Sequence, residues 1–209
     1  MSARGNALAL STALEGPTLL RALNGISSEI YCTAAVAVPY SFRVRSSDRR
    51  VYRYYEPGSG RDFGAWKKAA AVLVGDVDVR SFGRSIPRTE PVWRTIESIT
   101  VTQRGRGAVI EVRAPSFVWG MVRKLVGALR EHGAGRLPIE RLAAGARGEV
   151  RLLLPMAEPE GLVLWDVQYP LRWTNRWEGP NRRQKARARL VFDSLGVRRD
   201  VLRSLPVRP

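Results

Sequence analysis

The sequence predicts an α+β fold, with a mostly antiparallel sheet and helices on one face. Stretches rich in Val, Ile and Tyr alternate with amphipathic stretches, without the strict strand–helix–strand spacing of a parallel sheet. The tight turn "RGRG" at 104–107 joins two strand-like stretches and is typical of an antiparallel hairpin. The chain has 209 residues, of which 44% are hydrophobic, and is long enough to bury a substantial core.

Alternating polarity or a high content of β-branched and aromatic residues marks the predicted strands. In chain order they lie at 5–12, 33–38, 49–56, 93–103, 108–115 and 161–170. Apolar residues repeated every three or four positions mark the predicted helices. These lie at 16–25, 62–75, 114–135 and 138–147. Pro17 and Pro138 suit first helical turns, and Gly25 and Gly75 suit helix ends.

The predicted helix "APSFVWGMVRKLVGALREHGAG" (114–135) has two different faces. At 100° per residue an apolar stripe forms, made of Phe117, Val118, Met121, Val122, Leu125 and Leu129. Gly120, Arg123, Gly127 and Arg130 fall on the opposite side. A glycine inside a helix costs about 1 kcal/mol relative to alanine. We therefore expect another part of the chain to approach this face closely; the alternative is that both arginines are ordinary solvated charges.

The charge predicts a polyanionic partner, most often nucleic acid. Thirty-five Lys and Arg residues against 19 Asp and Glu give a formal net charge of +16. An arginine-rich composition also suits a GC-rich genome or a thermophile. Residues 172–209 carry 11 basic and three acidic residues, a net +8. This segment is either a solvated tail or an arm that follows a phosphate backbone.

Other features narrow the class of protein. A single cysteine, Cys32, excludes an intrachain disulfide framework and a multi-cysteine metal site. No apolar run approaches the roughly 20 residues of a membrane span, and "MSARGNALAL" lacks the features of a secretory signal. We expect a cytoplasmic protein in which Cys32 and His132 have structural roles.

Several stretches together resemble the archaeal members of the tRNA pseudouridine synthase A family. "SFVWGMVRKLVGAL" resembles the family helix "F-hh-MVR-hh-G-L", where h is mostly apolar. Further similar stretches follow the family order: "SFRVR" (41–45), "RRVYRYY" (49–55), "DVRSFGR" (78–84) and "LLLPMAEPEGLVLWDVQYP" (152–170). The resemblance covers about residues 1–170, which would be the C-terminal part of the catalytic domain, followed by a basic tail at 171–209.

The resemblance implies a pseudouridine synthase fold, incomplete at its N-terminus, and a homodimer that acts on tRNA. Such an enzyme detaches a uracil in the anticodon stem-loop from its ribose, rotates it and rejoins it through carbon, with no metal and no nucleotide cofactor. One Asp attacks the sugar or abstracts a ribose proton. The target base must leave its stack to be reached.

The resemblance also implies roles for particular residues. Tyr52 would stack on the target base, and Arg123 would pair with the Asp and keep it ionised. Tyr is also common in strands, so the alternative is that Tyr52 is an ordinary packing residue. Arg45 would lie near the active site. The basic tail adds candidate tRNA contacts at Arg182, Arg183 and Lys185.

The family Asp lies in "G-R-T-D-x-G-V-[HS]-A-x-G", whereas this chain begins "MSARGN". Ser2, Ala3 and Gly5 match the end of that motif, which places the Asp three residues before Met1. Either the start codon is miscalled or the chain is truncated. Asp78 and Asp166 lie at other positions, so we expect no pseudouridine formation by these 209 residues alone. The alternatives are a non-catalytic RNA-binding module and an unrelated basic α+β protein, such as a ribosomal component.

Overall fold

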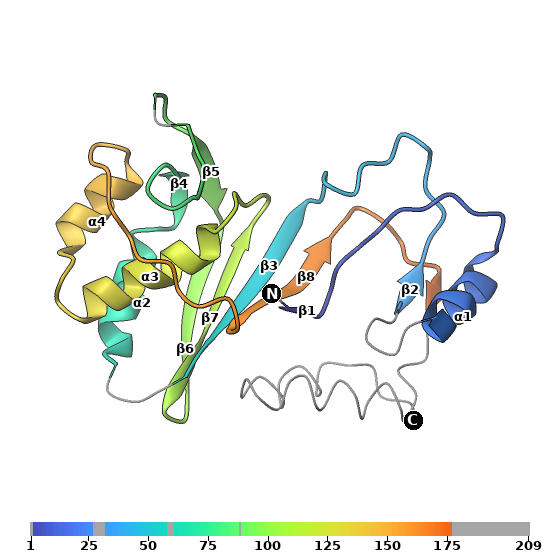
Figure 1. The fold of residues 1–209 in the computed structure, drawn as a ribbon, viewed down its shortest axis with the longest axis horizontal. Coiled ribbons are helices and arrows are strands. Elements are labelled where there is room, and N and C mark those ends of the chain that lie inside the picture. Colours follow the sequence, from blue (N-terminus) through green and yellow to red (C-terminus); the bar gives the residue numbers. More distant parts are fainter. Residues whose placement is uncertain (1, 27–31, 58–60, 88, 177–209) are drawn as a thin grey trace. The chain divides into compact units, whose positions relative to one another are not determined.

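The structure, a computed structural model, describes residues 2–26, 32–57, 61–87 and 89–176 (Figure 1). The chain forms two compact units. The first contains residues 1–6 and 47–168, and the second contains residues 7–46 and 169–209. Most of the predicted basic tail lies outside the described residues, so its separation from the rest stays a prediction.

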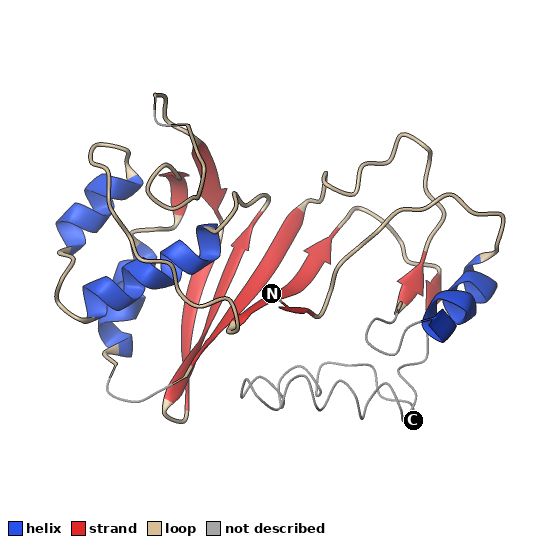
Figure 2. Cartoon of the chain, in the orientation of Figure 1, coloured by secondary structure: helices blue, strands red, loops and turns tan. Residues whose placement is uncertain are grey.

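A five-stranded sheet forms the centre of the first unit (Figure 2). Its order is β1 (Ser2–Ala3), β8 (Leu162–Gln168), β3 (Arg49–Glu56), β7 (Gly107–Ala114) and β6 (Ser98–Arg104). Only β1 and β8 pair in parallel; the other neighbours are antiparallel. The mostly antiparallel sheet predicted from the sequence, with its hairpin between β6 and β7, is confirmed.

Helices cover one face of this sheet, as Figure 1 shows. They are α2 (Phe63–Ala71), α3 (Met121–Gly133) and α4 (Ile139–Ala146). Trp66 of α2, Leu125 and Leu129 of α3 and Ile110 of β7 are fully buried in one core. A small antiparallel sheet of β4 (Gly75–Asp78) and β5 (Trp93–Ile96) completes the unit. The α+β class with helices on one face is therefore confirmed.

The second unit contains one helix and a short strand pair among its described residues. Helix α1 (Gly16–Ile26) begins and ends close to the predicted bounds. β2 (Ala34–Ala35) pairs antiparallel with β9 (Asn175–Arg176). The Asn24 amide donates to the Cys32 carbonyl and its oxygen accepts from the Cys32 amide, at 3.0 and 2.6 Å. Burial raises the pKa of the Cys32 thiol. Within the described ranges, no helix is long and apolar enough to cross a membrane.

Several predicted elements differ from the observed ones. Residues 5–12 form no strand, and the side chains of Leu8 and Leu10 are exposed rather than packed on a sheet face. Helix α2 ends at Ala71, because Gly75, with φ of 101°, already begins β4. The predicted strand 93–103 divides at Glu97, since its two halves pair in different sheets.

A buried ion pair joins α3 to β3. Arg130 donates from Nη2 and Nε to Glu56 Oε2, at 2.8 and 3.1 Å, and the Glu56 side chain is fully buried. Arg61 Nε lies 2.8 Å from the other Glu56 oxygen. Arg130 also donates to the Tyr54 hydroxyl and to Glu158. Burial, with the nearby carboxylates, raises the pKa of Tyr54 to about 12. Arg130 is thus no solvated charge but part of the core.

Arg130→Ala is expected to lower the free energy of unfolding by about 3 kcal/mol, because Glu56 loses one of two cations inside the protein. Chemical denaturation measures this change. Arg136→Ala is the matched control, since Arg136 forms a similar pair with Glu131 at the surface. The control should leave stability essentially unchanged. Equal stabilities of the two variants would contradict the structural role of the Glu56 pair.

Candidate active site

The helix that carries Arg123 begins later than predicted. Helix α3 starts at Met121 rather than at Ala114, and Gly120 is the residue immediately before it. Gly120 has φ of 77°, in the left-handed region that side chains other than glycine's rarely adopt. Its role is therefore to turn the chain from residues 115–119, which belong to no helix or strand, into the helix, and the expectation of a mid-helix Gly120 was wrong.

The glycine-bearing face of α3 is covered by residues 155–158, which we call the 155–158 segment. A Cβ atom on Gly127 would lie 2.0 Å from the Pro155 carbonyl oxygen, and one on Gly120 would lie 2.9 Å from Met156. Arg123 bonds to Ala157, and Arg130 Nη1 donates to Glu158 at 2.7 Å. The predicted close approach to this face is confirmed. The sequence had not indicated which part of the chain would make it.

Arg123 is fixed at one end and available at the other. Its Nε donates to the Ala157 carbonyl, and the Ala157 amide donates to the Arg123 carbonyl at 3.1 Å. The side chain is half-buried and forms no ion pair with any carboxylate in the described ranges. Its two terminal amino groups are therefore left without a described partner. A guanidinium held in this way can bind a carboxylate through both amino groups.

Tyr52 lies in β3 at an irregularity of the sheet. β3 pairs with β8 through Val51 and Asp166, then through Tyr52 and Leu164, so that Trp165 is an extra residue on β8. The Tyr52 ring is half-buried and meets Phe117 edge to face, with 4.9 Å between the ring centroids. Burial raises the pKa of the Tyr52 hydroxyl. The contact with Phe117 fixes the ring, which is what a stacking platform needs.

The start of the chain lies in the same row of the sheet as Tyr52. Ala3 of β1 pairs with Leu164 of β8, and Leu164 pairs with Tyr52 of β3. A residue that precedes Ser2 would therefore lie only two strands away from the Tyr52 strand. In the part of the chain that the structure describes, no hydrogen bond joins Arg123 to Tyr52. Helix α3 and strand β3 contact each other in the same core.

The other predicted site residues lie in the second unit or outside the described residues. Arg45 is exposed and belongs to the second unit, in the turn before β3. The three tail candidates, Arg182, Arg183 and Lys185, lie outside the described residues. Their roles stay predictions.

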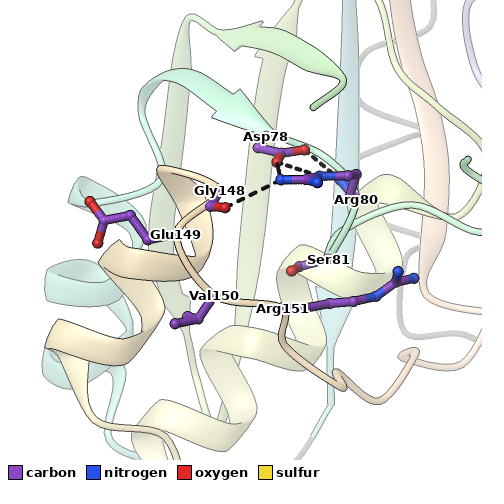
Figure 3. Close-up of a pocket in the computed structure, with 7 residues that line it drawn as sticks. All are labelled: Asp78, Arg80, Ser81, Gly148, Glu149, Val150 and Arg151. Carbon is purple, nitrogen blue, oxygen red and sulfur yellow. Dashed lines mark hydrogen bonds and ion pairs between the residues drawn. The ribbon is translucent and has the colours of Figure 1, made fainter. Parts of the chain in front are cut away.

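A pocket of about 260 Å³ lies beside α4 (Figure 3). It is lined by Asp78, Arg80, Ser81, Gly148, Glu149, Val150 and Arg151. The buried Asp78 carboxylate accepts from Arg80 Nε at 2.6 Å and from the amides of Arg80 and Val92 at 3.0 and 3.2 Å. Arg80 also donates to the Gly148 carbonyl at 3.2 Å. Asp78 thus anchors the loop after β4 and is not placed as a reactive carboxylate.

Gly127→Ala is expected to lower the free energy of unfolding by about 1–3 kcal/mol, because the new methyl group would overlap the Pro155 carbonyl. Helix propensity alone would favour alanine, so the sign separates packing from propensity. Gly25→Ala in α1 is the control, since no atom lies within 4 Å of its added methyl group. It should leave the melting temperature unchanged or slightly raised. A Gly127→Ala protein as stable as the parent would contradict the contact.

Asp78→Asn should flatten the loss of stability in acid. Burial raises the pKa of the Asp78 carboxyl, but the hydrogen bonds from Arg80 and Val92 outweigh it and hold the pKa below its ordinary value. The stabilisation from this carboxylate is therefore complete above about pH 4 and is lost as the pH falls through the lowered pKa. Urea denaturation between pH 2 and 6 measures the slopes. Parallel curves for the two proteins would refute the assignment.

The chain is similar to several proteins named tRNA pseudouridine synthase A. Residues 69–170 match the family model described as tRNA pseudouridine synthase. A protein named tRNA pseudouridine synthase A from Thermococcus kodakarensis is 38% identical over 159 residues, which cover 75% of this chain and 59% of that protein. Its namesake from Pyrococcus furiosus is 34% identical over 172 residues, covering 81% and 64%. That from Methanothrix thermoacetophila is 36% identical over 156 residues, covering 73% and 57%.

The chain spans about 60% of the length of the curated relatives it matches. The matched residues include β5 to β8 and the whole of α3 with the 155–158 segment. The similarity expected from the sequence motifs is confirmed, archaeal relatives included. Over residues 69–170, about half of its length, the chain is similar to the tRNA pseudouridine synthase family.

Proposed function

We propose that this chain is the arginine-bearing part of a tRNA pseudouridine synthase that isomerises uridine to pseudouridine in the anticodon stem-loop. The observation that carries the proposal is the geometry of Arg123, whose Nε is held by Ala157 while its terminal amino groups have no described partner. The matched relatives bear the name of this activity. A bidentate partner for these amino groups would be a carboxylate, which the reaction requires as nucleophile or base.

Arg123 would act on the carboxylate in two ways. A guanidinium in contact favours the ionised form, and its planar fork fixes the direction in which the oxygens point. The Ala157 carbonyl limits rotation of the guanidinium, so the fork would be oriented before the carboxylate arrives. The 155–158 segment also contacts Gly127, one helical turn after Arg123. The orientation of the guanidinium therefore depends on how the helix packs against this segment.

Tyr52 would receive the uracil. Its ring is held edge to face by Phe117 and remains half-exposed. A base flipped out of the RNA stack loses its neighbours, and a fixed aromatic ring replaces part of that stacking. The row Ala3–Leu164–Tyr52 supports a carboxylate carried three residues before Met1, within the family motif whose end the chain matches. The isomerisation breaks the bond from ribose to nitrogen and forms one to carbon, so no oxidant or reductant is needed.

The proposal extends to the RNA partner, the location and the oligomeric state of the protein. The net charge of +16 supports tRNA as partner, with Arg45 and the tail residues Arg182, Arg183 and Lys185 as contacts to phosphates. Cytoplasmic location and a homodimer are proposed from family resemblance. The second candidate function is a non-catalytic RNA-binding module. An in-frame Arg-Thr-Asp segment in the DNA before the first codon would favour the enzyme, and a stop codon there would favour the module.

Arg123→Ala should lower kcat at least about 100-fold in a protein extended upstream through that segment, because the carboxylate loses its partner. Unmodified tRNA and detection of pseudouridine by carbodiimide-primer extension give the rate. The affinity for tRNA should stay within a few-fold, since one charge adds little to a broad electrostatic contact. Arg123→Lys should recover only part of the rate, because an ammonium group lacks the fork.

Arg141→Ala is the matched control for the loss of one positive charge. Arg141 is exposed on α4 and has no partner in the described structure. It should keep the parental kcat and show the same small change in affinity. The assignment fails if Arg123→Ala turns over like Arg141→Ala, or if it loses tRNA binding while its kcat is unchanged.

A further inference from the structure

Trp119 is exposed in a position where the backbone is rigid. Its side chain is 65% exposed, whereas Trp66 and Trp165 are buried. The Trp119 carbonyl accepts from the Arg84 amide at 2.8 Å, and the next residue, Gly120, is fixed in the left-handed region. The Arg84 guanidinium lies over the indole ring, 4.5 Å from its centroid. The indole is therefore held in place while much of its surface is exposed to solvent. Packing of the core does not explain a tryptophan at this position.

The surroundings of Trp119 are positively charged. Arg84 forms no ion pair in the described ranges. Lys124, in the first turn of α3, forms none there either. Lys124 Nζ reaches the Ser81 carbonyl at 3.4 Å, and burial together with repulsion from Arg151 lowers its pKa. Arg151 is exposed and lines the pocket in Figure 3 together with Asp78 and Arg80.

Within the described residues, Arg84, Lys124 and Arg151 have no carboxylate partner, unlike neighbouring arginines. In the same region Arg80 is neutralised by Asp78, and Arg147 by Glu149. Arg84, Lys124 and Arg151 therefore leave a net positive surface around one rigid aromatic ring. An aromatic ring with cations beside it is the combination that binds unpaired nucleotides, because bases stack on the ring and phosphates face the cations. A purely apolar protein partner would gain nothing from three unpaired cations.

The place of Trp119 in the fold connects it with Tyr52. Phe117, which touches the Tyr52 ring, precedes Trp119 by two residues, and two residues of extended chain span at most about 7 Å. A strand of RNA that delivers one base to Tyr52 would thus bring an adjoining nucleotide within reach of Trp119.

We propose that Trp119, backed by Arg84, stacks on an unpaired RNA base that flanks the target uridine, while Lys124 and Arg151 face the adjoining phosphates. This inference rests on the proposed function, because it uses Tyr52 as the platform for the target base. It adds a second base contact, which would make the site prefer loops and other unpaired segments to continuous duplex.

The test compares two RNA probes bound to the 209-residue chain: an anticodon-arm stem-loop transcript and a fully paired duplex of the same length and charge. Fluorescence anisotropy at a fixed salt concentration gives each Kd. Trp119→Ala should weaken binding of the stem-loop about 5- to 100-fold and change binding of the duplex less than about twofold. Trp119→Phe should restore most of the loss. Trp119→Gln serves as a second variant, since a polar side chain suits an exposed position.

Two controls separate base stacking from charge and from general loss of structure. Trp93 on β5 is also exposed, and Trp93→Ala should bind both probes like the parent chain. Arg151→Gln should weaken both probes equally and reduce the slope of log affinity against log salt concentration by about 1.

The outcomes are distinguishable. If the parent chain binds neither probe, the proposed function fails and the inference fails with it. If the parent binds the stem-loop and Trp119→Ala and Trp119→Gln bind it equally well, the inference alone is overturned. Equal losses for both probes overturn it as well. Light scattering gives the oligomeric state, and a Trp119→Ala variant that dissociates a dimer would assign this surface to contacts between copies and also overturn the proposal.

Discussion

The contact between Gly127 of α3 and the carbonyl of Pro155 is the constraint on which the rest of the first unit depends. No side chain longer than hydrogen fits between them, so the 155–158 segment can lie directly against the helix backbone. That approach brings the Ala157 carbonyl to Arg123 and the Glu158 carboxylate to Arg130. Four residues later the chain enters β8, which pairs with β3. One close contact therefore sets the position of the helix, the direction of Arg123 and the entry into the central sheet.

Four arginines of this unit differ in the kind of partner that they bind. Arg130 and Arg80 bind the buried carboxylates of Glu56 and Asp78 and hold elements of the fold together. Arg123 and Arg84 bind a carbonyl and an indole ring respectively, and neither forms an ion pair with a described carboxylate. Some of the positive charge therefore stabilises the fold, and some of it is left without a described counter-charge. The buried carboxylates of Glu56 and Asp78 pair with arginines, whereas Arg84 and Arg123, near the start of α3, have no carboxylate partner among the described residues.

Helical periodicity alone placed Gly127, Arg123 and Arg130 on one side of a helix, because that pattern depends only on local geometry. It did not reveal the 155–158 segment, since a partner about 30 residues away without a periodic pattern leaves no local signal. It also extended the helix back through Phe117 and Val118, whose spacing to Met121 and Val122 fits a helix although Gly120 turns the chain there. The ion pair of Arg130 with Glu56 had no signal at all, because the sequence does not show which strand end a helix will cover. Family resemblance alone assigned Tyr52 to base stacking and Arg123 to the catalytic carboxylate.

The central claim is that Arg123 holds the carboxylate that performs the isomerisation. A crystal structure of the protein extended upstream of Met1 measures this directly, through the distances from the two terminal nitrogens of Arg123 to the nearest carboxylate. The account predicts a bidentate contact of about 2.7–2.9 Å to a carboxylate that precedes Ser2, with Nε still bonded to Ala157. A structure in which that carboxylate pairs with another cation, or in which Arg123 turns away to bind elsewhere, would contradict it.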